Sequence, residues 1–268
     1  MKKISNRNTI LVMIAIISVT ILIICIILLS MYSISEYSSE KKTDEVRSLV
    51  SSESSGTGNI YTDEAVGYKT DEVHTQVLDK YSEAYKKNPD LAGWIKIENT
   101  HIDYPVMQSL YDEEYYLHRD FDGEDSDDGL PFMDIRCILS RPSTNYLIFG
   151  HNMKSGNMFA DLLKYADKSF YDEHRQISFD TIYEEGSYEI IAVFRTRVAF
   201  RDENTFRFYN FIEADDTPEF NDYLDNIRAL SLYKIDTEVD SSDRLLTLTT
   251  CEYTVEDGRF VVVAKKIN

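Results

Sequence analysis

The sequence has only three cysteines in 268 residues. Cys25 falls in a long apolar run near the N-terminus, which leaves Cys137 and Cys251 for the rest of the chain. Two thiols exclude the disulfide framework of a small secreted domain, and a domain of about 190 residues can build a core without one. A single bond between Cys137 and Cys251 stays open at this point, and the alternative is that both are free thiols.

Basic side chains are scarce as well: 28 Lys and Arg stand against 47 Asp and Glu, for a net charge of −19. Nucleic-acid binding depends on clustered cationic side chains, so this composition excludes a nucleic-acid partner. The acidity fits an exported domain that must stay soluble, and it would suit a partner or substrate with basic groups.

The longest apolar run covers residues 10–29 and contains no charged residue. At about 1.5 Å per residue, a helix of this length spans roughly 30 Å, the hydrocarbon thickness of a bilayer. A cleaved signal peptide is the alternative, but its apolar core would be shorter, and no small-x-small cleavage site follows the run. We therefore expect residues 1–32 to be a cytoplasmic tail and an uncleaved anchor in the cell membrane. The tail should stay inside and the rest of the chain outside, because three basic residues precede the run: Lys2, Lys3 and Arg7.

Residues 33–70 are rich in Ser, Glu, Lys, Asp and Thr. They carry too little apolar surface to fold alone, so we expect a flexible extracellular stalk. Residues 71–268 then form the folded domain. Its first segment, residues 71–87, has apolar side chains at three- and four-residue steps, which predicts a helix that stops at Pro89.

The rest of this domain consists mostly of short runs of apolar and β-branched residues, which predict strands. Two helices are expected among them, a short one at residues 158–165 and a longer one at residues 217–230, where Pro218 lies in the first turn. The small number of helices and the lack of internal repeats or βαβ alternation favour a mainly β domain, either a barrel or a sandwich. The expected strands cover residues 93–97, 102–107, 130–138, 145–150, 187–200, 206–212, 245–251 and 259–264.

An acidic cluster at residues 120–128 is the candidate metal site. If Gly129 is taken as the sixth position of a calcium loop, the twelfth position is Ile135, where such a loop needs Glu. No helices are expected on either side, so we interpret the cluster as a solvated loop and predict no metal. The oxygen ligands that the calcium alternative would use are Glu124, Ser126 and Asp128.

The last two expected strands place a thiol beside a guanidinium. Asp257 and Gly258 predict a turn between them, so the strands should pair antiparallel. Cys251 ends the first strand and Arg259 begins the second, which puts them at the same end of the sheet. The thiol could be a nucleophile with a cationic partner for developing negative charge; the alternative is a structural cysteine beside a surface arginine. Arg244 is the other candidate arginine, but it lies at the opposite end of the strand that ends with Cys251. It is therefore roughly 20 Å from the thiol.

His151 directly follows the buried-strand pattern of residues 145–150, so it too lies where a strand meets a loop. Polar groups at such positions can face a cleft while the strand holds them rigid. By pattern alone His118, which is set among aromatic residues, is equally well a site residue or a packed ring.

Residues 247–251, TLTTC, resemble the T-L-x-T-C signature of sortases, the membrane-anchored transpeptidases of Gram-positive bacteria. Arg259 falls at the spacing where that family has its arginine. Residues 146–159 resemble the histidine segment of class B sortases, and residues 88–108 resemble the start of their domain. One departure is Thr249, where class B members more often have Ser, and we expect it to change substrate fit at most.

The resemblance covers most of residues 75–268 and implies a closed β-barrel of about eight strands, with an N-terminal helix and a helix inserted between two late strands. It implies that Cys251 cleaves a C-terminal sorting motif of secreted proteins after Thr, holds the acyl group as a thioester and passes it to a peptidoglycan amine. His151 would move the protons, and Arg259 with the backbone N–H of Glu252 would stabilise the oxyanion. This chemistry needs no metal or organic cofactor. The implied substrate-binding positions are Thr249, Thr250 and Glu252.

Two other functions remain as alternatives. A membrane-tethered cysteine protease of the papain type would have its cysteine early, in a C-G-S-C-W type segment, with the histidine downstream. Here His151 precedes Cys251 by 100 residues and no such segment exists. A non-enzymatic binding domain, with Cys251 incidental, predicts that loss of the thiol changes only packing.

Overall fold

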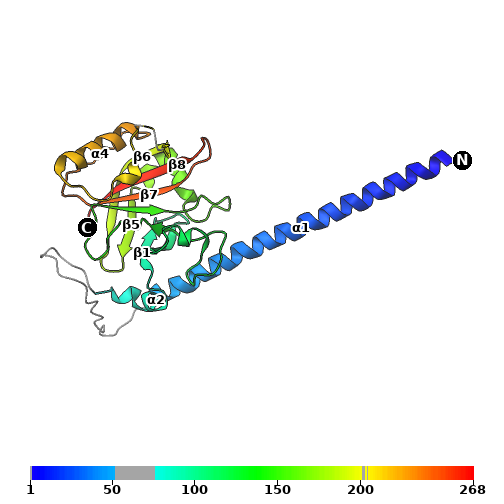
Figure 1. The fold of residues 1–268 in the computed structure, drawn as a ribbon, viewed down its shortest axis with the longest axis horizontal. Coiled ribbons are helices and arrows are strands. Elements are labelled where there is room, and N and C mark those ends of the chain that lie inside the picture. Colours follow the sequence, from blue (N-terminus) through cyan, green and yellow to red (C-terminus); the bar gives the residue numbers. More distant parts are fainter. Residues whose placement is uncertain (1, 52–75, 201–202, 204) are drawn as a thin grey trace. The chain divides into compact units, whose positions relative to one another are not determined.

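The computed structural model describes residues 2–51, 76–200, 203 and 205–268 (Figure 1). These residues form two compact units, Met1–Lys42 and Thr43–Asn268. The first unit consists of the helix α1, Lys2–Ser51, up to residue 42. Its stretch Thr9–Met31 is long and apolar enough to cross a membrane, and its apolar side chains are exposed. An N-terminal apolar helix that fits membrane anchoring is therefore present.

The end of α1 differs from the expected stalk. The helix continues to Ser51, and residues 43–51 belong to the second unit, where Val46 is 2% exposed. A guanidinium nitrogen of Arg47 donates to the carbonyl of Asp103 at 2.8 Å. Thr43, Val46 and Leu49 recur at three-residue steps, so this polar segment has one helical stripe that packs on the domain. The rest of the expected stalk, residues 52–70, lies outside the described residues.

Eight strands form a closed barrel in the order β1-β2-β3-β4-β7-β8-β6-β5, with β5 paired to β1 (Figure 1). The pairs β2–β3 and β4–β7 are parallel and the others are antiparallel. Closure leaves no open sheet edge, and it confirms the predicted mainly β barrel of eight strands. The strands are β1 Leu91–Lys96, β2 Asp103–Met107, β3 Phe132–Met133, β4 Asn145–Phe149, β5 Gln176–Thr181, β6 Ser187–Arg197, β7 Leu245–Cys251 and β8 Gly258–Lys266.

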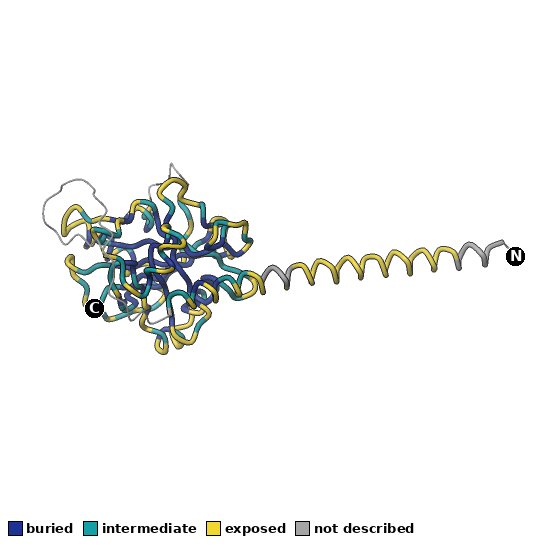
Figure 2. Tube along the Cα trace, turned by 90° about the horizontal axis from the view of Figure 1, so that it is seen from below, coloured by how far each residue is buried: buried dark blue, intermediate teal, exposed yellow. Residues whose placement is uncertain are grey.

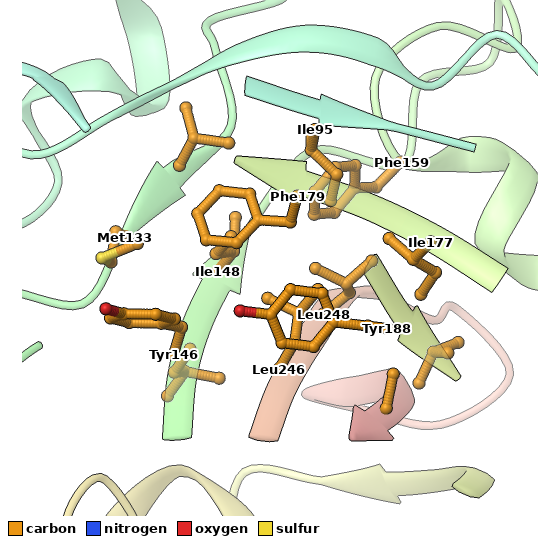
Figure 3. Packing of buried hydrophobic residues seen from close by; sticks show 14 of the residues in the cluster. Ile95, Met133, Tyr146, Ile148, Phe159, Ile177, Phe179, Tyr188, Leu246 and Leu248 are labelled. Atoms are coloured by element: carbon orange, nitrogen blue, oxygen red, sulfur yellow. The ribbon is translucent and has the colours of Figure 1, made fainter. Parts of the chain in front are cut away.

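The buried residues lie in the middle of the folded unit (Figure 2), and many of them belong to the barrel strands. Tyr146 and Ile148 of β4 point inward beside Leu246 and Leu248 of β7, as strand alternation requires (Figure 3). Burial of each of the aliphatic side chains Ile148, Leu246 and Leu248 stabilises the fold by about 1.5–3 kcal/mol. The odd-numbered residues of β7 face the other way, so the side chain of Cys251 belongs to the outer face of the barrel wall.

The helix between two late strands is present as predicted. It is α4, Thr217–Leu230, and its N-cap Asp216 accepts the N–H of Glu219 at 2.9 Å. Its buried stripe contacts β6, and Tyr223 stacks on Phe211 with ring centroids 4.0 Å apart. The remaining helical segments are η1 Asp79–Tyr81, α2 Ser82–Lys87, η2 Tyr115–His118, η3 Ala160–Ala166, α3 Lys168–Glu173 and η4 Phe208–Asn210.

Several predicted elements were wrong in extent or type. The expected helix at residues 71–87 begins only at Asp79, within the part that is described. The expected strand at residues 206–212 is a loop with the short turn η4, because Phe208, Phe211 and Ile212 bury their side chains without strand pairing. The apolar run at residues 130–138 pairs only over β3. Neither β5 nor α3 was predicted.

Candidate active site

The predicted thiol and guanidinium meet at the end of the β7–β8 hairpin. Cys251 is paired with Arg259 in the antiparallel register, as the last pair of the ladder. Directly opposed residues have Cβ atoms about 4.5–5.5 Å apart and side chains on the same face. Both residues are half-buried. The predicted juxtaposition of the two residues is therefore confirmed.

His151 reaches the same place from the other side of β7. Strand β4 runs parallel to β7 with Phe149 level with Thr249, and the N–H of Gly150 donates to the carbonyl of Thr249 at 3.1 Å. The ladder ends at Phe149, and His151 follows two residues later. The next residue, Asn152, is hydrogen-bonded to Cys251, so the His151 segment lies beside the end of β7.

Two hydrogen bonds tie these strand ends together beyond the ladder. The side-chain amide of Asn152 donates to the carbonyl of Cys251 at 2.9 Å, and the Thr250 hydroxyl donates to the carbonyl of Gly150 at 2.7 Å. Three separate sequence segments thus gather His151, Cys251 and Arg259 on adjacent strand ends. Asn152 was missed by sequence reasoning, although its place directly after the histidine is a signal that could have found it.

The His151 ring is held by a carbonyl from η2. Its Nε2 lies 2.8 Å from the carbonyl oxygen of Leu117. Because a carbonyl only accepts, Nε2 carries the hydrogen, and Nδ1 is the nitrogen that can exchange a proton with a reacting group. His118, the residue after Leu117, is exposed. Its ring lies beside that of His151, with the two ring centroids 5.5 Å apart and the ring planes inclined by 31°. His118 therefore neighbours the site and is not a packed core ring.

A cavity of about 340 Å³ lies next to the arginine side of the site. On β6, Thr196 is paired with Arg259, so the cavity begins one strand beyond the guanidinium. Within it, Arg197 donates to the carboxylate of Glu203 at 2.6 Å. The cavity is lined by Thr196, Arg197, Glu203, Thr205 and Phe206.

The predicted substrate-binding positions Thr249 and Thr250 do not face the site surface. Thr249 is 1% exposed and Thr250 is 2% exposed, so neither can touch a bound peptide in this arrangement. The Thr250 hydroxyl is used to join β7 to β4. The Thr249 hydroxyl is buried without a hydrogen-bond partner among the described residues. The neighbouring strands cover both side chains in this structure, and direct contact with a bound peptide stays a prediction for both residues.

The backbone N–H and the carboxylate of Glu252 both form hydrogen bonds within the turn that follows Cys251. Its N–H donates to the carbonyl of Gly258 at 2.9 Å, so this N–H is not available to an oxyanion unless that bond breaks. Its buried carboxylate accepts the N–H and hydroxyl of Thr254 at 3.1 and 2.5 Å. The turn has Asp257 at φ 53°, and a Cβ on Gly258 would lie 2.2 Å from the Glu252 carbonyl oxygen. Position 258 therefore requires glycine, because a side chain there would collide with the backbone of Glu252. The positive φ of this turn belongs to Asp257.

The second thiol of the domain is structurally distinct from Cys251. Cys137 is 3% exposed, and burial raises the pKa of its thiol to about 12. All three cysteines are free thiols, so the disulfide alternative is not formed in this structure. A buried thiol that stays protonated is a poor nucleophile, whereas Cys251 is half-buried at a strand end.

The acidic loop is closed by its own hydrogen bonds. Asp120 accepts the backbone N–H groups of Asp122 and Glu124 at 2.9 and 3.0 Å, and Arg119 pairs with Asp125 at 2.9 Å. Within the described part of the chain, no group of three or more His, Cys, Asp or Glu side chains is arranged to hold a metal ion.

Arg244, the alternative arginine, has a structural role. It forms two hydrogen bonds to Glu184, at 2.5 and 3.1 Å, and Lys266 donates to the same carboxylate at 2.7 Å. Burial by itself would raise the pKa of Glu184, but the hydrogen bonds from Arg244 and Lys266 outweigh it and lower that pKa below 4.5. A carboxylate with a lowered pKa stabilises the fold above its unfolded pKa, and this stabilisation is lost as the pH falls through the folded pKa.

We expect Glu184→Gln to lower the free energy of unfolding by about 2 kcal/mol at pH 7, because Arg244 and Lys266 lose their charged partner. The difference from the wild type should shrink as the pH falls below the unfolded pKa of Glu184 and then through its lowered folded pKa, because the wild-type carboxylate is lost as well. Urea unfolding at several pH values measures this. Glu185→Gln, at the neighbouring exposed carboxylate, is the matched control and should change stability by less than about 0.5 kcal/mol. A pH-independent difference would contradict the charge argument.

A closed β-barrel that brings a half-buried cysteine, an oriented histidine and an arginine to one edge defines a class: an acyl-transfer enzyme that works through a thiol. Comparison with known proteins specifies the class further. The sortase domain family matches residues 95–267, and the chain belongs to the sortase family. It is a class B sortase by its relatives, and thus a cysteine transpeptidase that acts on proteins bearing a sorting motif.

Among the relatives, sortase B of Listeria monocytogenes is 37% identical over 210 residues, which cover 78% of this chain and 81% of that protein. Sortase B of Staphylococcus aureus is 33% identical over 195 residues, covering 71% and 76%. The crystal structure of sortase B from Bacillus anthracis matches with a TM-score of 0.69 at 29% identity, over 88% of this chain and 99% of that one. The family predicted from the TLTTC segment is confirmed, and the papain-type and binding-domain alternatives gain no support.

Proposed function

We propose that Cys251 is the nucleophile of the transpeptidase, with His151 as its proton-transfer group and Arg259 as the oxyanion partner. The observations that support this proposal are the pairing of Cys251 with Arg259 and the hydrogen bond from Asn152, the residue after His151, to the Cys251 carbonyl. Cys251 is also the half-buried thiol of the folded unit, while Cys137 is enclosed in the core.

In the first half-reaction, the Cys251 thiolate attacks the carbonyl carbon of a threonine in the C-terminal sorting motif of a secreted protein. The carbonyl oxygen becomes negative, and the guanidinium of Arg259 stabilises it. Because the N–H of Glu252 already donates to Gly258, this proposal assigns the oxyanion to Arg259 rather than to both groups. The C–N bond then breaks, the leaving amine takes a proton from Nδ1 of His151, and a thioester remains on Cys251.

In the second half-reaction, an amine of a peptidoglycan precursor attacks the thioester and gives a proton to His151. The thioester suits this transfer because it keeps the acyl group activated until an amine arrives. The motif itself is proposed to run from Cys251 across Arg259 toward the 340 Å³ cavity, where Thr196, Thr205 and Phe206 offer both polar and apolar contacts.

We also propose where this chemistry occurs. The stretch Thr9–Met31 would hold the enzyme in the cell membrane as a single-pass anchor. Lys2, Lys3 and Arg7 before it favour a cytoplasmic N-terminus, which places the domain outside. Exported proteins and peptidoglycan precursors would then be accessible to the site.

The test is to incubate the purified full-length protein in detergent with a panel of peptides that carry candidate sorting motifs, and to follow its intact mass. We expect one or a few peptides to leave an acyl adduct with the mass of the motif cut after Thr. The adduct should accumulate without an amine and disappear when one is added. A folded protein that forms no adduct with any motif, including those of the organism's own surface proteins, would refute the proposal.

A further inference from the structure

His118, the second histidine at the site, has no role in the two half-reactions proposed for Cys251 and His151. It is exposed, its ring lies 5.5 Å from that of His151, and it follows directly after Leu117, whose carbonyl binds His151 Nε2. The backbone at His118 is fixed, because its carbonyl accepts the N–H of Ser126 at 3.0 Å. The segment η2 therefore places two groups beside His151. The Leu117 carbonyl orients the His151 ring, and the His118 imidazole can itself accept a proton.

The proton balance of the second half-reaction leaves one proton without an acceptor. An amine with an α-amino pKa of about 7.7–8.0 arrives at neutral pH mainly as an ammonium. When it becomes an amide nitrogen it loses two protons: thioester plus R–NH₃⁺ gives amide, thiolate and two H⁺. His151 can take only one of them, because Leu117 occupies its Nε2 and leaves Nδ1 for exchange.

We propose that His118 accepts the first of these two protons, converting the incoming ammonium into the free amine that attacks the thioester. This rests on the proposed function of Cys251 and His151. The nitrogen lone pair then forms the C–N bond, the C–S bond breaks to release the Cys251 thiolate, and the second proton goes to His151. His118 is exposed, so it returns its proton to water before the next turnover.

The position of His118 fits an acceptor amine rather than the sorting motif. Arg259 and the cavity lie on the β8 and β6 side of Cys251, whereas His151 and His118 lie on the β4 side. An amine within hydrogen-bond distance of His151 is within reach of His118 directly or through one water. The ionisable ring beside His118 is that of His151, and the charge of the adjacent Arg119 is paired with Asp125.

The experiment compares wild type, His118→Gln and a matched control, His101→Gln, as full-length proteins in detergent. His101 is an exposed histidine that pairs with Asp161 and is not at the site. Acyl-enzyme formation is followed by intact mass without amine, and transfer is then started with either glycylglycine or hydroxylamine between pH 6 and 10. Hydroxylamine is largely uncharged at pH 7, so it does not need the first proton removed.

We expect His118→Gln to form the acyl-enzyme within about twofold of the wild-type rate but to transfer it to glycylglycine about tenfold more slowly at pH 7. The loss should fade as the pH rises above about 8, and it should be absent with hydroxylamine. His101→Gln should match the wild type throughout.

Three outcomes would overturn the inference. An equal loss with both nucleophiles at every pH would mean that His118 only supports the structure of η2. Faster acylation of His118→Gln at low pH would mean that His118 acts through its charge on His151. Unchanged transfer would mean that water alone removes the proton. Absence of any acyl-enzyme in the wild type would instead refute the proposed function itself, so the two failures are distinguishable.

Discussion

Cys251→Ala is expected to form no acyl-enzyme with any sorting-motif peptide that labels the wild type. The reason is covalent: without the sulfur no thioester can form, and neither His151 nor Arg259 can replace it. Loss of a nucleophile costs about 10⁶ in kcat in a well-studied hydrolase, so turnover should fall below detection. The folded structure should persist, because Cys251 is half-buried at the edge of the barrel and outside its core. Intact mass and circular dichroism, measured on the same sample, check both statements.

Cys137→Ala is the matched control for this prediction. Cys137 is 3% exposed, its thiol has a pKa raised to about 12 by burial, and its Sγ lies 3.5 Å from the Leu147 nitrogen. Its replacement should leave acylation at wild-type rate while lowering stability by roughly 1 kcal/mol, as loss of a small buried group does. An adduct that persists in Cys251→Ala would show that Cys251 is not the nucleophile. Loss of the adduct in a fully folded Cys137→Ala variant would contradict the assignment as well.

The site could be predicted from the sequence where it depends on local pattern. Cys251 and Arg259 are separated by a short turn, so strand pairing alone sets them side by side, and the structure has them as a register pair. Asp257 and Gly258 predict that turn through residue type, although the positive φ falls on Asp257. The helix Thr217–Leu230 was predictable for the same reason, since its cap, proline and apolar stripe are all local.

The parts that sequence could not supply depend on contacts between distant segments. The carbonyl of Leu117 binds His151 across 34 residues, and a backbone carbonyl carries no residue-type signal. His118 is recognisable as a histidine, but only the fold places it next to His151. Thr249 and Thr250 belong to the signature, yet only the fold shows that neighbouring strands bury both side chains. The end of α1 has a polar composition that hides its packed stripe at Val46.

His151→Gln is expected to lower the rate of acylation by an amide-bonded sorting peptide by about 10²–10⁴, the usual contribution of a positioned acid or base. An amide nitrogen leaves as an amine only if it gains a proton as the C–N bond breaks. Gln keeps a side-chain N–H that can still meet the Leu117 carbonyl, but it cannot give a proton away. The fold and the Cys251 thiol should therefore remain while the proton donor is lost, and single-turnover mass kinetics measures the effect.

The decisive comparison is between two leaving groups on the same motif. An ester with a good leaving group needs little protonation when its C–O bond breaks, so His151→Gln should acylate from such an ester far closer to the wild-type rate than from the amide. Arg259 stabilises the oxyanion in both substrates, so an Arg259 variant should lose rate on both alike. The ratio of amide to ester rates thus separates a proton donor from an oxyanion partner within one site. If His151→Gln lost the same factor on ester and amide, His151 would be assisting the attack of Cys251 instead of protonating the leaving amine.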